Sequence, residues 1–150
     1  MSTSAPDKRG VWPEVLEWLR VAASDQRAAR LCLAADPPQC DVAAFLCQQA
    51  TEKLLKGFLV SAGDDFRKTR DLAKLGQSVL LHFPWLAELV ATAGAWTIWN
   101  IAYRYPAESG PEPEPTADEL AEVLGLIANL ANMLRSLEPP SDPDKPTQGA

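Results

Sequence analysis

Residues 41–63, DVAAFLCQQATEKLLKGFLVSAG, decide the fold class because they carry the period of an amphipathic helix. At about 100° of rotation per residue, the small and apolar residues gather on one side. These residues are Ala43, Leu46, Cys47, Ala50, Leu54, Gly57 and Phe58. Asp41 is the expected N-cap residue of this helix, and Gly63 is the glycine expected at its C-terminal end. We therefore predict a helix from residue 41 to residue 63.

The opposite side of this predicted helix is polar, but it also holds the apolar residues Phe45 and Leu59. Its polar members are Gln48, Gln49, Glu52, Lys53 and Lys56. The i,i+4 spacing allows Gln49 to pair with Lys53, and Glu52 with Lys56. Two interpretations stay open. The helix is central and buries both sides, with solvated pairs, or this side contacts a second copy or another protein, with Phe45 as an anchor.

The rest of the chain is also typical of helices, with prolines between them. Eight of the 13 prolines lie in residues 105–115 and 139–150, and proline cannot continue a helix. Strand signals are nearly absent. Further helices are predicted from Trp12 to the Asp36-Pro37-Pro38 turn, over 71–83, over 84–103 and from Thr116 onward.

Short connections between long helices favour antiparallel neighbours. The predicted fold class is therefore all-α, a four- to five-helix up-and-down antiparallel bundle over residues 12–138. Residues 1–11 and the proline-rich tail 139–150 are expected to be disordered.

Two apolar stripes mark the faces that the first and last helices are expected to bury. The first helix carries Val15, Leu16, Leu19, Ala22, Ala23 and Leu33. The last carries Leu120, Val123, Leu124, Ile127, Ala131 and Leu134. Thr116, with Glu119 three residues later, forms a capping-box pattern.

The composition argues against several classes of protein. The chain has 150 residues, of which 47% are apolar, enough for one domain with one core. No apolar run is long enough to cross a membrane, and the polar first residues do not suggest a secretory signal. The net charge of −6 argues against nucleic-acid binding through bulk charge.

Chemically reactive residues are few. Three cysteines without CxxC spacing and one histidine, His82, do not make a zinc site, and we expect thiols in a reducing cytoplasm. No nucleophile constellation or glycine-rich phosphate loop is found. The sequence thus predicts no catalytic residues, no metal and no cofactor.

A basic segment, RKTRDLAK at residues 67–74, stands out in this acidic chain. It begins a predicted helix, where free N–H groups favour an anion, so Lys68 and Arg70 are candidate phosphate ligands. Arg104 and Tyr105, at the end of the 84–103 helix, are further candidates. The alternative is a solvated loop balanced by Asp64 and Asp65.

Aromatic residues line one face of the 84–103 helix, and at this spacing they are expected mainly in the core rather than stacking on bases. The residues of this face are Trp85, Leu89, Thr92, Trp96, Trp99 and Tyr103.

Three elements together resemble the HEPN domain family. FLCQQATEKLLKGFL at residues 45–59 is similar to its signature helix, F-x-x-Q-Q-A-x-E-K-x-L-K. FRKTRDL at 66–72 resembles its K-T-H-D-L element, and RYP at 104–106 its R-Y-P element. The resemblance implies a helical bundle that forms homodimers. It also implies pairing with a minimal nucleotidyltransferase protein, often in a toxin–antitoxin-like module where the HEPN member can be a metal-independent ribonuclease.

The chain departs from the ribonuclease pattern, in which an arginine precedes a histidine by four to six intervening residues. Leu75, Gly76 and Gln77 stand where that arginine would precede His82, and Arg104 has no histidine after it. We therefore expect a non-catalytic, cytoplasmic, homodimeric protein that binds a nucleotidyltransferase partner and/or a nucleotide or RNA. The alternatives are a ribonuclease with an atypical active site and a purely architectural dimer.

Overall fold

The computed structural model describes residues 8–64, 72–91 and 115–141, and these parts contain helices and no strand. The long helices are α1 (Lys8–Ala34), α2 (Cys40–Ser61) and α5 (Ala117–Arg135). The shorter ones are α3 (Leu72–His82) and the 3₁₀ helix η1 (Pro84–Leu86), after which residues 87–91 are helical. The expected all-α fold class is confirmed.

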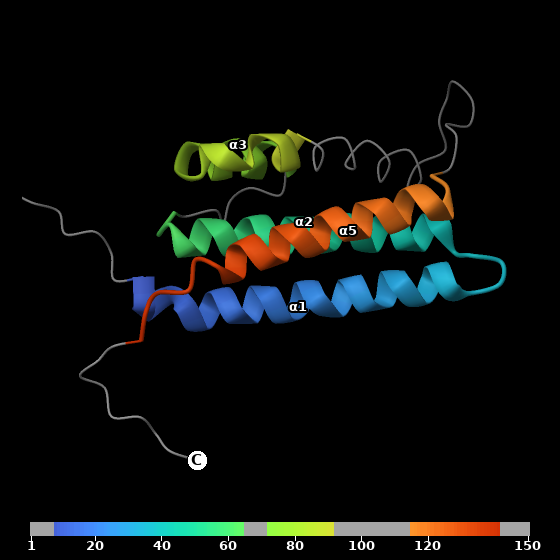
Figure 1. Ribbon diagram of the computed structural model, residues 1–150, viewed down its shortest axis with the longest axis horizontal. Helices are drawn as coiled ribbons and strands as arrows, with labels where there is room; N and C mark the ends of the chain where they lie inside the picture. Colours follow the sequence, from blue (N-terminus) through green and yellow to red (C-terminus); the bar gives the residue numbers. More distant parts are fainter. Residues whose placement is uncertain (1–7, 65–71, 92–114, 142–150) are drawn as a thin grey trace, which may run out of the picture.

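Helix α2 is the centre of the bundle, because α1, α3 and α5 all pack against it (Figure 1). α1 and α2 form an antiparallel hairpin. α5 runs in the same direction as α2, so that Leu134 near the end of α5 lies against Gly57 near the end of α2. No described helix is long and apolar enough to span a membrane.

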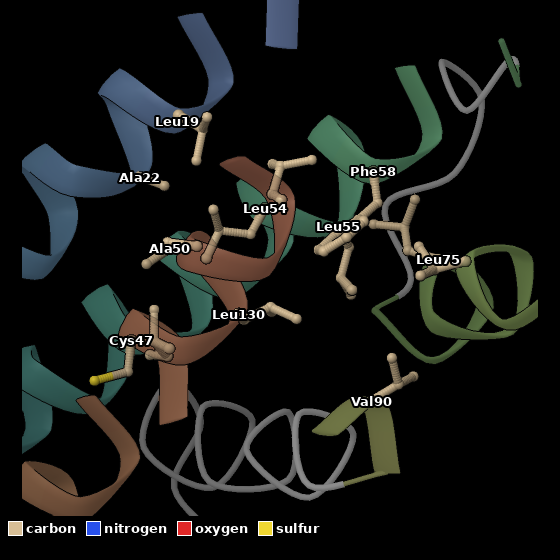
Figure 2. Close-up of a cluster of buried hydrophobic side chains, with 14 of the residues drawn as sticks. Leu19, Ala22, Cys47, Ala50, Leu54, Leu55, Phe58, Leu75, Val90 and Leu130 are labelled. Atoms are coloured by element: carbon tan, nitrogen blue, oxygen red, sulfur yellow. The ribbon is translucent and has the colours of Figure 1, made fainter. Parts of the chain in front are cut away.

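The hydrophobic core consists largely of the apolar stripes that the sequence predicts for α2 and α5. Every residue of the predicted α5 stripe is buried, and the Thr116 side chain accepts the Glu119 N–H at 3.1 Å in a complete capping box. Figure 2 shows Leu54 of α2 beside α5, and Leu55 of α2 on the side toward Leu75 of α3.

The predicted start and stripe of α1 were partly wrong. The helix begins at Lys8, so Pro13 is its sixth residue and removes a donor from the second turn instead of marking the first. Leu16 is 50% exposed, whereas its neighbour Val15 is fully buried. Adjacent residues point about 100° apart, and only one of them can face α2. The buried row is Trp12, Val15, Leu19, Ala22, Gln26 and Ala29.

The ends of α2 also differ slightly from the prediction. Gln39, not Asp41, is the N-cap residue, and it makes no side-chain cap. At the other end Gly63 has φ 74°, the left-handed conformation that favours glycine after a helix. The predicted first residue of the 71–83 helix, and the predicted 84–103 helix beyond residue 91, lie outside the described residues.

Candidate functional site

A row of charged residues runs along the side of the α1–α2 hairpin. Lys53 Nζ of α2 lies 2.5 Å from Asp25 Oδ2 of α1, and Lys56 Nζ lies 2.9 Å from Glu52 Oε1. The side chains are 17–27% exposed. The expected Glu52–Lys56 pair is therefore confirmed, whereas Lys53 has an ion-pair partner on α1.

An aromatic residue that the sequence interpretation missed joins this row. Lys56 Nζ lies 5.6 Å from the centre of the Trp18 ring, a cation–π contact between α2 and α1. Trp18 is half-buried, as are Phe45 and Gln49 of α2. We call this surface the α1–α2 face: Trp18, Asp25, Phe45, Gln49, Glu52, Lys53 and Lys56. Only the register of the hairpin, which sequence periodicity does not give, brings Trp18 and Asp25 to it.

Two residues expected on the polar side of α2 lie elsewhere. Leu59 is 1% exposed and belongs to the core. Gln48 is half-buried, and helical spacing places it in the row of Leu55 and Leu59, toward α3. Its Oε1 is buried, and no hydrogen-bond donor is found for it. The row of Leu59 is thus buried, as the central-helix interpretation expects, whereas the row of Gln49 is half-buried and both interpretations stay open for it.

The candidate phosphate ligands Lys68, Arg70, Arg104 and Tyr105 lie outside the described residues. Immediately before the basic segment, Asp64 Oδ2 lies 2.9 Å from His82 Nε2 at the end of α3. The two side chains are 33% and 37% exposed. Sequence spacing does not predict this pair, because 18 residues separate the two side chains and only the fold brings them together.

The expectation that Trp85 lies in the core was wrong. Trp85 is 58% exposed and contacts Phe83 edge-to-face, with ring centres 6.2 Å apart. Pro84 opens a 3₁₀ turn rather than an α-helical one, which changes the direction of the side chains expected from a continuous helix. Trp96, Trp99 and Tyr103 lie outside the described residues.

The sequence expectations about metal-ligand clusters and cysteine thiols can be compared with the described residues. No cluster of three or more histidine, cysteine or acidic side chains occurs in them. None of the three cysteines is in a disulfide. Cys47 is 1% exposed, and burial raises the pKa of its thiol to about 12, so it stays protonated near neutral pH.

Comparison with known proteins supports the resemblance seen in the sequence. The family model of the HEPN domain matches residues 15–137, which is most of the chain. Neither the curated proteins nor the solved structures compared with the chain give a significant match. The length of the family match, together with the all-helical bundle, establishes that the chain belongs to the HEPN domain family.

Proposed function

We propose that this chain is a non-catalytic HEPN protein that forms a homodimer and binds a minimal nucleotidyltransferase protein, a nucleotide, or both. In this role it is one member of a toxin–antitoxin-like module. The observation that carries the proposal is the α1–α2 face, where half-buried charges are paired beside half-buried aromatic rings.

The pairing of charges makes this face suitable for covering by another protein. Asp25 and Lys53 neutralise each other, as do Glu52 and Lys56, so a partner would not bury an isolated charge. Trp18 and Phe45 supply aromatic surface of the kind that dominates binding energy at interfaces. The α2 residues of this face belong to the HEPN signature helix at residues 45–59.

A matched pair of substitutions tests the face. Gln49→Arg adds a long cationic side chain to its middle, and Gln77→Arg makes the same change on the exposed side of α3. Light scattering after size-exclusion chromatography should show a dimer for the wild type and Gln77→Arg, and a monomer for Gln49→Arg with unchanged helicity. Dimers of equal stability for all three proteins would refute the role of the face.

The nucleotide part of the proposal depends on the basic segment and its chemistry. Lys68 and Arg70 supply positive charge, and Arg104 with Tyr105 supplies a planar fork and a ring. Lys68→Glu with Arg70→Glu should abolish nucleotide or RNA binding and leave the circular dichroism spectrum unchanged. Binding that is unaltered in a salt titration would count against this site.

A second candidate, a ribonuclease with an atypical active site, is favoured by the His82–Asp64 pair. A carboxylate within hydrogen-bond distance of an imidazole can fix the tautomer that acts as general base. Cleavage of RNA by the purified chain in EDTA, lost in His82→Gln and in Asp64→Asn, would decide for this candidate. Loss in Arg104→Ala with retention in His82→Gln would instead place the chemistry at Arg104.

A further inference from the structure

Two of the three cysteines flank the turn that joins α1 to α2. Cys32 is in the last turn of α1, and Cys40 is the first residue of α2. The N–H of Gln39 donates to the carbonyl oxygen of Cys32 at 2.9 Å. Standard bond lengths then hold the Cα atoms of Cys32 and Gln39 within about 7 Å of each other. Cys40 is the next residue, so the two cysteines lie on either side of one short turn.

The surroundings of the two side chains are also alike. Both are half-buried, and both pack against the same hydrophobic core. Neither is in a disulfide, and each retains contact with solvent. Cys47 differs because it is 1% exposed in the interior.

From this geometry we propose that Cys32 and Cys40 form a reversible disulfide that ties the end of α1 to the start of α2. The site is independent of the nucleotide and partner functions proposed above. The cross-link would fix the turn at the end of the hairpin, five residues before Phe45 of the α1–α2 face.

The oxidant is a small-molecule disulfide such as oxidised glutathione. One cysteine thiolate attacks a sulfur of that disulfide, forming a mixed disulfide and releasing one glutathione thiolate. The second cysteine thiolate attacks the protein sulfur of the mixed disulfide, forming the Cys32–Cys40 bond and releasing the second glutathione. Two protein thiols are oxidised and one glutathione disulfide is reduced to two thiols.

The sequence allows a direct test by peptide mapping. Trypsin leaves all three cysteines in one fragment, because no lysine or arginine lies between Arg30 and Lys53. A protease that cleaves before aspartate separates them, since Asp36 lies between the first two cysteines and Asp41 between the last two. The folded protein is incubated with oxidised glutathione and then alkylated in denaturant without reductant. The masses of the intact chain and of its proteolytic fragments are measured by mass spectrometry.

The proposal predicts that the fragment 25–35 is linked to the fragment 36–40, and that the link disappears with dithiothreitol. The intact chain should lose about 2 Da, the mass of two hydrogen atoms, and two of its three alkylatable thiols. On a non-reducing gel it should migrate as a single chain. Cys32→Ser and Cys40→Ser should each abolish the link, whereas Cys47→Ala should retain it.

Three results would overturn the proposal: three thiols that remain alkylatable, stable glutathione adducts on separate cysteines, or a link between two chains. Circular dichroism of each variant establishes that the loss of the link does not come from unfolding.

Discussion

Replacing Gly57 with alanine tests the packing at the centre of the bundle. A Cβ atom at this position would lie 2.7 Å from Leu134 Cδ2 of α5 and 3.4 Å from Trp18 Cβ of α1. Leu134 is fully buried and has little room to move. The glycine therefore lets α2 approach both neighbouring helices closely, and we expect Gly57→Ala to destabilise the protein.

The magnitude follows from two opposing effects. Overpacking a core costs about 1–3 kcal/mol, and alanine is about 1 kcal/mol better than glycine inside a helix. The net loss for Gly57→Ala is therefore about 0–2 kcal/mol. Gly125 of α5 is exposed, and a Cβ atom added there would meet no other atom within 4 Å, so Gly125→Ala should gain about 1 kcal/mol.

Thermal unfolding measures the difference between the two variants. The gap of about 1–3 kcal/mol corresponds to a Tm difference of about 2–12 °C in a chain of this size. Gly125→Ala should melt above the wild type, and Gly57→Ala at or below it. If Gly57→Ala raised Tm as much as Gly125→Ala, the close packing of α2 against α1 and α5 would be refuted.

Three further predictions concern single interactions. Burial raises the pKa of Cys47 from 9.0 to about 12, so between these pH values the unfolded chain loses a proton that the folded chain keeps. The free energy of unfolding should then fall by about 1.4 kcal/mol per pH unit more in the wild type than in Cys47→Ala, and equal slopes in urea titrations would contradict this. A double-mutant cycle with Asp25→Asn and Lys53→Met should give a coupling of about 1 kcal/mol, because the pair is mostly buried, whereas zero coupling would show that water screens it. Thr116→Ala should cost about 1 kcal/mol by removing the acceptor of the Glu119 N–H, and an unchanged urea midpoint would mean that the cap does not form in solution.

The parts of the fold that the sequence predicts best are those governed by local periodicity. The α5 stripe from Leu120 to Leu134 is buried throughout, and the capping box at Thr116 is formed. These features depend only on residues three or four apart. The start of α1 was less predictable, because proline is favoured in the first turn but is tolerated as far in as Pro13.

The candidate site depends on contacts between residues that are far apart in the sequence, and such contacts cannot be predicted from sequence periodicity. Sequence spacing identifies the Glu52–Lys56 pair, which lies within one helix. It does not identify Asp25 as the partner of Lys53, because that contact needs the register of the α1–α2 hairpin. The His82–Asp64 pair was missed for the same reason. Resemblance to the HEPN family indicated the signature helix without indicating which neighbours complete its surface.

Sedimentation equilibrium of the purified wild-type chain tests most directly whether this HEPN bundle forms a homodimer. We predict a particle with twice the chain mass of 16.3 kDa at micromolar concentration. A particle of 16.3 kDa that does not associate as its concentration rises would contradict it.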